Sequence, residues 1–409
     1  MQKLLILGNN NKTDVLIKVA KARGIYTILT DNQPVEKSTF KKLVDEAWDI
    51  SITDVDAIVE KATAEGVTGV TSGASEICMG YVREICKKMN LPFYISDRAW
   101  EITNDKLKFK ELCKKHDIPV AREFKLDINF AKEDLEKISY PVIVKPADGC
   151  SSIGLHLCKN EEELIIGYKD AYEKSKAKKV VLEKFYSGAE VSLLFTFYNG
   201  EATLVETGET FGYKIDSMPF IFGNGPSVCV KRFHDELVPN LKELFKDMEC
   251  NSGVGLVQVI TEGDEYVITE MNYRLPGGNS PVQDYICECV MDAVMSQNRF
   301  ESLPAYVQPQ APAYFMWINP GTIGSIEGLE KVKELPGVYT IFQNLKVGDK
   351  ILPGSGMRQI MGTVLMLCDF DQLKINAREI NKLVSIKDET GKDMMRRFEI
   401  DDNNNVIEL

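Results

Sequence analysis

The sequence predicts a mixed fold, with α/β character in the first hundred residues and α+β character in the remainder. Up to about residue 100, short apolar runs alternate with stretches of helical periodicity. Such alternation is typical of a parallel sheet with helices on its faces. After Thr103 the pattern changes to a β-rich chain with interspersed helices. A chain of 409 residues also exceeds what one core usually holds, so two or three domains are expected.

The first hundred residues are expected to bind a ligand at one edge of their sheet. Strands are predicted at Lys3–Gly8, Ile25–Thr30 and Val67–Thr71, with helices at Thr13–Arg23, Asp54–Glu65 and Ser75–Met89. Parallel sheets bind ligands at the carboxyl ends of their strands, here near Gly8, Asp31 and Ser72. A dinucleotide site is disfavoured, because the segment after Gly8 (NNNKT) lacks the further glycines that let a pyrophosphate approach the backbone.

The rest of the chain divides near a proline-rich linker at Pro304, Pro309 and Pro312. The expected domains are therefore 1–100, 101–308 and 309–409. In the middle part, strands are predicted at Val142–Lys145, Leu155–Cys158, Val180–Glu183, Glu190–Tyr198, Val254–Ile260 and Glu265–Asn272. Helices are predicted at Lys106–His116, Glu161–Ser175, Asp235–Asp247 and Asp284–Asn298.

Composition and charge exclude several classes of function. The chain has 49 basic and 61 acidic residues, a net charge of −12, which disfavours binding to nucleic acids or anionic membranes. The apolar run at the N-terminus is too short for a signal peptide, and no stretch reaches the length of a membrane span. We therefore expect a cytoplasmic protein. The ten cysteines include no C-x-x-C pair and the three histidines have no metal-ligand spacing, so reduced, buried thiols are expected.

Two segments suggest a site for phosphate groups. Lys106 follows a helix-capping cluster, and Lys145 ends a predicted strand that opens into a Gly/Ser loop at 148–154. Such a loop can lay backbone N–H groups over phosphate oxygens, and lysine supplies a compact positive charge on a flexible stem. Taken alone, the loop is equally consistent with a plain β-hairpin, because Gly/Ser turns between strands are common.

A third and a fourth segment supply carboxylates and amides. After the strand ending at Glu183, the turn to Glu190 can offer backbone groups to an adenine and a carboxylate to ribose hydroxyls, although most glutamates are simply solvated. In the strand that contains Glu270, the residues Glu270, Asn272 and Arg274 project to one face, because the side-chain period is two. Oxygen donors beside an arginine suit Mg²⁺ and phosphate, and packing alone does not explain such a face.

In this order and spacing, the four segments resemble the ATP-grasp superfamily, in the branch of carboxylate–amine ligases that includes L-amino-acid ligases and proteins similar to biotin carboxylase and carbamoyl phosphate synthase. The resemblance runs from about Lys3 to Gly278 and is fainter beyond residue 310. It implies an N-terminal parallel α/β domain (the pre-ATP-grasp domain), a central two-lobed ATP-grasp domain with its lid lobe at about 118–188, and a small C-terminal β-rich domain.

The resemblance also implies ATP as the nucleotide and Mg²⁺ or Mn²⁺ as the metal. The implied nucleotide-binding residues are Lys106, Lys145, Asp148, Gly149, Ser151, Ser152, Glu183, Lys184, Phe185 and Glu190. Among them, the two lysines hold phosphates, the loop forms a mobile lid, the segment 183–185 contacts adenine and Glu190 contacts ribose. The implied metal ligands are Glu270, Asn272 and Gln258, and the implied catalytic residues are Arg274 and Lys145.

Gln258 departs from the family pattern, which usually has a carboxylate twelve residues before the glutamate of the E-x-N motif. If the hairpin turn is a three-residue loop at 263–265, Gln258 and Glu270 face each other. Glutamine can ligate Mg²⁺ through its carbonyl oxygen but contributes no charge. Two interpretations follow: an active enzyme whose substrate phosphates supply the missing charge, which we favour, or a nucleotide-binding protein with little turnover.

By this resemblance, the chain is expected to be an ATP-dependent ligase that forms an acyl phosphate, couples it to an amine, and releases ADP and phosphate. A bicarbonate-dependent carboxylase and a non-catalytic ATP-binding protein are the alternatives. The substrates are expected to be a small carboxylate and an amine, with an amino acid as the best candidate, and the segment Thr207–Gly225 is expected to line the acceptor pocket. A homodimer is expected only by analogy, and no base for the amine is identified.

Overall fold

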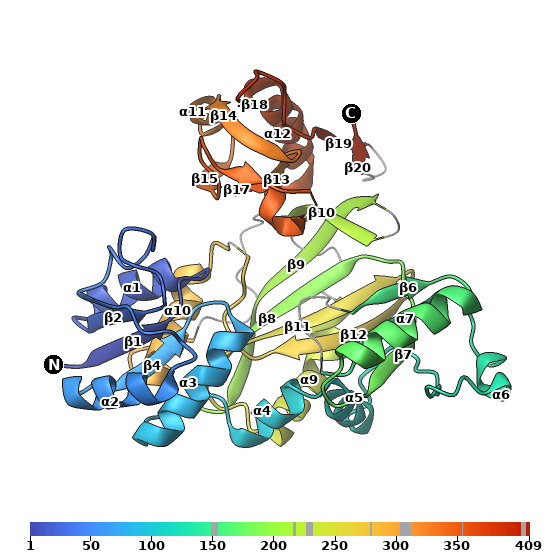
Figure 1. Ribbon diagram of the computed structural model, residues 1–409, viewed down its shortest axis with the longest axis horizontal. Helices are drawn as coiled ribbons and strands as arrows, with labels where there is room; N and C mark the ends of the chain where they lie inside the picture. Colours follow the sequence, from blue (N-terminus) through green and yellow to red (C-terminus); the bar gives the residue numbers. More distant parts are fainter. Residues whose placement is uncertain are drawn as a thin grey trace.

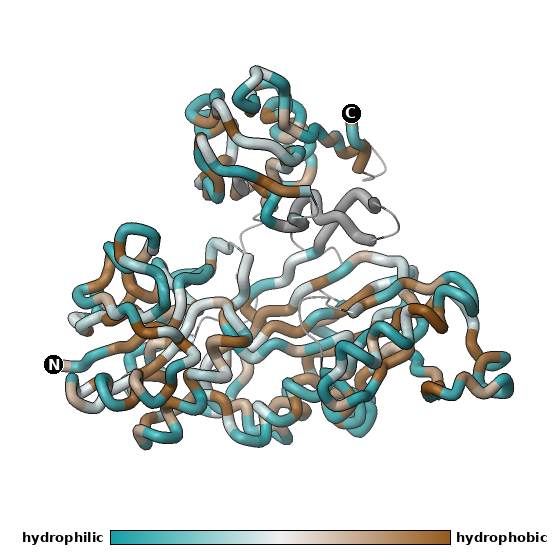
Figure 2. The backbone as a smooth tube through the Cα atoms, viewed as in Figure 1, coloured by the Kyte–Doolittle hydropathy of each residue, from teal (hydrophilic) through white to brown (hydrophobic). Residues whose placement is uncertain are grey.

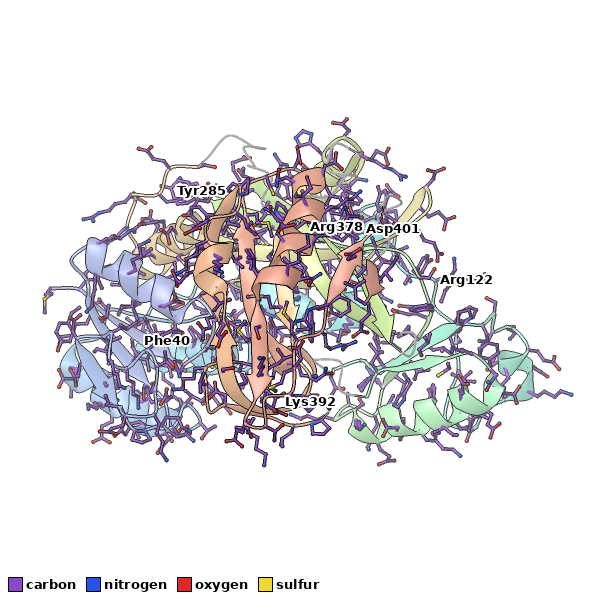
Figure 3. The ribbon with its side chains drawn as sticks, turned by 90° about the horizontal axis from the view of Figure 1, so that it is seen from above. Phe40, Arg122, Tyr285, Arg378, Lys392 and Asp401 are labelled. Carbon is purple, nitrogen blue, oxygen red and sulfur yellow. The ribbon has the colours of Figure 1, made fainter. Side chains whose placement is uncertain are left out.

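The computed structural model describes residues 1–148, 154–215, 218–225, 232–278, 280–302, 312–353, 355–401 and 406–409. Figure 1 shows an N-terminal parallel sheet at one end, a smaller lobe at the other, and a long sheet between them. The C-terminal elements lie above this middle sheet. Seen from above, they cover the centre of the molecule, between the N-terminal sheet and the small lobe (Figure 3).

The N-terminal sheet has the predicted parallel architecture. Its strand order is β3-β2-β1-β4, with β1 at Lys3–Leu7, β2 at Tyr26–Thr30, β3 at Glu46–Trp48 and β4 at Gly69–Ser72. Helices α1 (Thr13–Ala22), α2 (Val55–Glu65) and α3 (Glu76–Met89) connect the strands. The predicted strands and helices of this region are confirmed to within two residues at each end. Strand β3 was not predicted, because three residues carry too little alternation to be recognised.

Two helices lead from this sheet to a small three-stranded lobe. They are α4 (Asp97–Thr103), which was not predicted, and α5 (Lys106–Lys115). The lobe has the order β6-β5-β7, with β5 at Val142–Pro146, β6 at His156–Cys158 and β7 at Val180–Lys184. Helix α7 (Glu161–Lys174) packs on one face of this sheet, and the short α6 (Lys132–Leu135) lies near it.

The largest sheet has eight strands in the order β12-β11-β8-β9-β10-β13-β17-β15. Its first five strands are β8 (Glu190–Tyr198), β9 (Glu201–Ile215), β10 (Met218–Gly225), β11 (Gly253–Glu262) and β12 (Glu265–Asn272). Helix α9 (Val238–Asp247) covers one face, where the Phe195 and Phe197 rings each lie 5.0 Å from the Phe245 ring. Helix α10 (Gln283–Met295) packs between this sheet and α1.

The C-terminal strands continue the same sheet. Strand β13 (Ala313–Trp317) pairs with β10, and β17 (Ile360–Met366) and β15 (Val338–Gln343) follow it. The remaining C-terminal elements are β14 (Gly321–Glu327), α11 (Leu329–Val332), β16 (Lys350–Ile351), the 3-10 turn η2 (Gly356–Gln359), α12 (Phe370–Leu383), β18 (Ser385–Asp388), β19 (Phe398–Ile400) and β20 (Val406–Glu408). The predicted small C-terminal β-rich region is therefore present, and its sheet is joined to the central one.

The predicted helix at Asp235–Asp247 consists of two parts. A single π-helical turn, η1 (Phe233–Leu237), precedes α9. Pro239 lies in the first turn of α9, where the missing N–H of proline is tolerated because no partner is available there in any case. Side-chain periodicity runs through both parts, so the sequence alone does not separate them.

Apolar side chains form three separate cores among the described residues. Figure 2 shows hydrophobic residues, in brown, in the N-terminal sheet, the central sheet and the C-terminal elements. The N-terminal sheet and the central sheet share the largest core, which includes Leu5, Phe195 and Val290. The small lobe has its own core around Val144 and Leu164, and the C-terminal elements have a third. Residues on both sides of position 100 thus pack together as one unit.

The thiols behave as expected. The eight cysteines among the described residues are unpaired, and all of them except Cys368 are buried. In this described part of the chain, none of the helices is both long and apolar enough to cross a bilayer.

A buried ion pair fixes α1 against α10. The Arg23 guanidinium donates to Asp292 at 2.8 Å, and both side chains are almost completely buried. The Asp292 carboxylate also accepts hydrogen bonds from the backbone N–H groups of Arg299 and Phe300. Because removing one partner leaves a buried charge uncompensated, this junction depends on both residues.

We therefore expect Asp292→Ala to destabilise the shared core by about 3–5 kcal/mol, the range for breaking a buried ion pair. Urea unfolding followed by tryptophan fluorescence would measure the loss. Lys246→Ala, which removes an exposed pair with Glu243, is the matched control and should leave the unfolding curve unchanged. Equal unfolding curves for the wild type and Asp292→Ala would show that this pair does not hold α1 to α10.

Candidate functional site

The small lobe presents Lys145 on the face opposite α7. Side chains alternate along β5, so Val142 and Val144 enter the core beneath α7 while Lys145 points to the other side. On the neighbouring strand β7, Glu183 faces the same way, because Ile143 pairs with Glu183 and Lys145 with Val181. Lys145 Nζ lies 2.8 Å from Glu183 Oε2, and the two strands thus form a buried ion pair.

Helix α5 adds two further ammonium groups. Asp105 caps this helix by accepting hydrogen bonds from the N–H groups of Leu107 and Lys108, which places Lys106 at the first helical position. Lys110 lies one turn later, and residues four apart on a helix project to the same side. The Lys110 side chain is 2% exposed and is paired with Glu123, at 3.0 Å, and with Glu183. Lys110 was not predicted to be part of the site.

Strands β11 and β12 supply the carboxylate and amide oxygens. Gln258 pairs directly with Glu270, as predicted. The Asn272 amide donates to Glu270 Oε1 at 3.2 Å, and Arg274 Nη2 lies 3.5 Å from Asn272 Oδ1. The row of Glu270, Asn272 and Arg274 is therefore confirmed. Arg274 also binds Glu76 of α3 at 2.8 Å, so this row reaches the N-terminal sheet.

Gln258 and Glu270 face each other across the hairpin for a different reason from the one predicted. The hairpin turn has two residues, Gly263 and Asp264, because Glu262 pairs with Glu265. The register then shifts by one residue between Val259, which pairs with Ile268, and Gln258. Thr269 is the extra residue of this β-bulge, and its hydroxyl donates to the Gln258 carbonyl at 3.2 Å. Without the bulge, Glu270 would share the core-facing side of Ile268.

Helix α5 and strand β12 meet at these charges, where Lys106 Nζ lies 3.9 Å from Glu270 Oε2. The strand with the predicted metal ligands and the lysines predicted to bind phosphate therefore border one site. Burial, together with the cations of Lys110 and Lys106, lowers the pKa of Lys145 to about 7, although the carboxylates of Glu270 and Glu123 act in the opposite direction. Burial also lowers the pKa of Lys110. Several ammonium groups brought together in this way favour a bound polyanion.

Glu190 and Gln258 are directly linked. The Gln258 amide N–H donates to Glu190 Oε1 at 2.7 Å. Burial, together with the negative charge of Glu270, raises the pKa of Glu190. The predicted ribose contact thus lies next to the predicted metal ligands, on the same sheet face, since Ser192 pairs with Gln258 and Glu190 lies two residues before it.

The predicted nucleotide contact Asp148 is bonded within the protein. Its carboxylate accepts hydrogen bonds from Ser175 Oγ at 2.7 Å and from the N–H of Ala177 at 3.1 Å. The Ser175 hydroxyl and the Ala177 amide stabilise its negative charge, which lowers the pKa of Asp148. Asp148 therefore anchors the start of the loop to the segment that follows α7. Gly149, Ser151 and Ser152 lie outside the described residues.

The adenine segment also differs from expectation. Glu183 is 4% exposed, and its carboxylate forms ion pairs with Lys110 and Lys145. The N–H groups of Lys184 and Phe185 already donate to the carbonyls of Arg122 and Pro141, at 2.9 and 3.1 Å. The Lys184 ammonium lies over the Tyr186 ring and 3.3 Å from Glu262. Neither the Glu183 carboxylate nor these two amides are therefore open to an adenine ring.

The oxygen donors fit a magnesium-type cation whose remaining ligands come from phosphates. Glu270 offers a carboxylate, and Gln258 and Asn272 offer amide oxygens on the same face. Among the described residues, no three His, Cys, Asp or Glu side chains form a preformed metal cluster. Mg²⁺ is commonly bound by one or two carboxylates together with substrate phosphates.

Parts of the chain are similar in sequence to known proteins. Residues 112–215 match the family model described as the C-terminus of D-ala D-ala ligase. Among curated proteins, the chain is 25% identical over 185 residues to the small subunit of 2-oxoglutarate carboxylase from Hydrogenobacter thermophilus, with 42% of this chain and 39% of that protein covered. It is 26% identical over 268 residues to the carbamoyl phosphate synthase large chain of Clostridium botulinum, with 63% and 24% covered. The chain therefore spans well under half the length of these relatives.

Solved structures match over nearly the whole chain. Phosphoribosylglycinamide synthetase from Anaerococcus prevotii and an L-amino acid ligase from Bacillus licheniformis each give a TM-score of 0.75. Their identities are 22% and 19%, with 95% of this chain covered in both, and with 100% and 99% of those chains. The biotin carboxylase domain dimer of the Hydrogenobacter thermophilus 2-oxoglutarate carboxylase, solved with MgADP and bicarbonate, also has a TM-score of 0.75, at 17% identity, with 97% and 92% covered.

The low pKa of Lys145 predicts that nucleotide binding takes up a proton. At pH 8 the group is mostly neutral in the free protein, because its pKa is about 7. A bound polyphosphate favours the charged ammonium and raises this pKa. Affinity for ADP should therefore fall as the pH rises above 7, by up to about tenfold per pH unit. Calorimetry at pH 8 in buffers of different ionisation enthalpy would measure the uptake.

Two variants make this measurement specific. Lys145→Met should abolish the proton uptake, whereas Lys125→Met, at an exposed position of the same lobe, should retain it. Binding that is independent of pH between 7 and 9 in the wild type would mean that no polyphosphate reaches Lys145.

Proposed function

We propose that this chain, which has the ATP-grasp fold, is an ATP-dependent ligase that joins a carboxylate to an amine through an acyl phosphate and releases ADP and phosphate. The approach of Lys106 to Glu270, at 3.9 Å, carries this proposal. It brings a lysine suited to bind phosphate and a carboxylate suited to bind a metal ion together from different parts of the chain. Lys145 and Arg274 complete a set of charges suited to phosphoryl transfer.

In the first step, Lys106 and Lys145 bind the phosphates of ATP and orient the γ-phosphoryl group toward the substrate carboxylate. A carboxylate oxygen attacks phosphorus, the bond to the β-phosphate oxygen breaks, and ADP leaves. Such transfers need mainly positioning and charge stabilisation, so no nucleophilic serine or cysteine is required. Lys110 supports this step by neutralising Glu183, which leaves more of the Lys145 charge for phosphate.

Glu270, Asn272 and Gln258 are the residues that would hold Mg²⁺ or Mn²⁺ through their oxygen atoms. When bound, the cation neutralises charge on the phosphate oxygens. Arg274 is positioned beside Asn272 for contact with a phosphate or acyl phosphate, and Glu76 fixes its orientation. We further propose that the lobe 118–188 closes over the nucleotide and excludes water from the acyl phosphate.

The substrates are proposed by chemical class. An amino acid is our candidate for the carboxylate, because one of the similar structures is an L-amino acid ligase. A homodimer is our proposal for the assembly, because another similar structure is a dimer. We also propose that the chain has three domains, at residues 1–100, 101–308 and 309–409.

A bicarbonate-dependent carboxylase is the second candidate, since a curated relative and a similar structure are carboxylases of this kind. The experiment that separates the two measures phosphate release from ATP. Standard amino acids, singly and in pairs, form one set of additions, and bicarbonate alone forms the other. A ligase releases phosphate only when a carboxylate is present, and the rate rises with an amine. Lys106→Met should lower any release by about 10²-fold or more.

Release driven by bicarbonate alone would favour the carboxylase and contradict the ligase. Absence of release under every condition, with ADP binding intact, would support the non-catalytic alternative that Gln258 suggests. Lys125→Met, at an exposed position, is the control and should release phosphate at the wild-type rate.

Gln258 gives a separate prediction about the metal. Gln258→Glu loses the hydrogen bond to Glu190 and places a third carboxylate beside Glu190 and Glu270. Without Mg²⁺, repulsion among the three should lower the thermal midpoint relative to the wild type. With Mg²⁺, the variant should gain more stability than the wild type, because a cation that binds only the folded state stabilises it.

Differential scanning fluorimetry across a Mg²⁺ titration measures both effects. Gln343→Glu, at an exposed position of β15, adds the same charge elsewhere and should show neither. An identical Mg²⁺ response in Gln258→Glu and the wild type would remove residue 258 from the metal site.

A further inference from the structure

A second β-bulge, in β9, turns Glu206 toward the candidate site. Ala202 pairs with Phe197 and Leu204 with Phe195, so these residues share the face that packs against α9. The register then shifts by one residue, and Glu206 pairs with Leu194. Val205 is the extra residue of the bulge. In a regular strand, side chains two residues apart lie on the same face. Without the bulge, Glu206 would therefore lie on the α9 side with Ala202 and Leu204.

The strand register places Glu206 in the same row as a proposed metal ligand. Glu206 pairs with Leu194, Leu194 with Leu256, and Leu256 with Asn272. Residues paired in this way share one face of the sheet. Three strand spacings of ~4.8 Å put Glu206 on the order of 14 Å along the sheet from Asn272. That span leaves room for an acyl phosphate and a second substrate side by side.

Glu206 is half-buried where three parts of the chain meet. Ser280, which follows the strand of Glu270 and Arg274, donates its hydroxyl to Glu206 Oε2. The carboxyl end of β1 approaches the same region, because the Asn11 amide donates to the Gly277 carbonyl at 3.1 Å. Within the described part of the chain, no donor reaches Glu206 Oε1. One carboxylate oxygen therefore stays open to a ligand.

Glu206 is not placed here simply to form a structural ion pair with Lys12. Lys12 is 3% exposed and donates to Gln283 Oε1 at 3.2 Å. Within the described residues its ammonium forms no ion pair with Glu206, although its charge is close enough to affect Glu206. A half-buried carboxylate without a direct cationic partner is costly unless it has another role.

Burial raises the pKa of Glu206 to about 7, while the Ser280 hydroxyl and the charge of Lys12 act in the opposite direction. A carboxylate with such a pKa is partly ionised at neutral pH and can both accept and release a proton. The other proposed site carboxylates are committed to Gln258, to Asn272 or to the lysines.

We propose that Glu206 binds the ammonium group of the amine substrate and accepts its proton, which makes the amine nucleophilic. The inference rests on the proposed ligase function and assigns its second step. The ammonium gives one proton to the Glu206 carboxylate and becomes a neutral amine. The nitrogen lone pair attacks the acyl carbon, the C–N bond forms and the C–O bond to phosphate breaks. Phosphate leaves with that electron pair and takes the second nitrogen proton.

Hydroxylamine separates this role from a structural one. It is already neutral at pH 7, so it traps an acyl phosphate as a hydroxamate without a base. We expect Glu206→Gln to lower amide formation from pairs of standard amino acids by about 10²-fold or more, the usual contribution of a general base. Hydroxamate formation from the same carboxylate should change less than twofold. Glu201→Gln, an exposed carboxylate on the same strand, is the control and should leave both rates unchanged.

The pH profile gives a second readout. Amide formation by Glu206→Gln should recover as the pH rises toward 9, because more of the amine is then neutral in solution. Among the described residues, Lys12 and Ser280 are the charged and polar groups that act on Glu206, and both remain in this variant. Equal losses of amide and hydroxamate, or no loss of amide, would overturn the role of Glu206. Failure of the wild type to form any hydroxamate would instead overturn the ligase proposal itself.

Discussion

The site depends on the convergence of three ammonium groups, those of Lys106, Lys110 and Lys145, on a small set of carboxylates. Lys110 and Lys145 share Glu183, and Lys106 lies next to Glu270. Buried like charges repel each other, and the lowered pKa of Lys145 reflects both this repulsion and burial. A polyphosphate removes that cost, so the folded chain is already prepared for the anion. The small lobe, α5 and β12 must all be in place for this to happen.

Two β-bulges bring carboxylates to the face of the central sheet that carries the candidate site. The extra residue Thr269 turns Glu270 away from the core that Ile268 enters, and the extra residue Val205 does the same for Glu206. Bulges are common next to active sites because they redirect a side chain without ending the strand. The same face therefore carries proposed metal ligands at one end and the proposed amine-binding carboxylate at the other. The N-terminal sheet closes this face through Arg274 and Asn11.

Local patterns predicted much of this, and long-range packing explains what they missed. Strand alternation and the Asp105 cap are local, so the sequence identified β5, β8, β12, Lys106 and Lys145. Lys110 was missed because helical lysines are usually solvated, and only the fold shows it buried. The bulge before Glu206 has no sequence signal, so its face was not predictable. The hydrogen bond from Ser175 to Asp148 was not predicted, because a carboxylate in a loop gives no sign of a partner 27 residues away.

The most direct test of the central claim is a crystal structure of the chain with Mg²⁺ and a non-hydrolysable ATP analogue. The account predicts that the triphosphate lies between Lys106 and Lys145, with a cation bridging it to Glu270 and Asn272. A nucleotide whose phosphates contact neither lysine, or a cation bound away from β12, would contradict it.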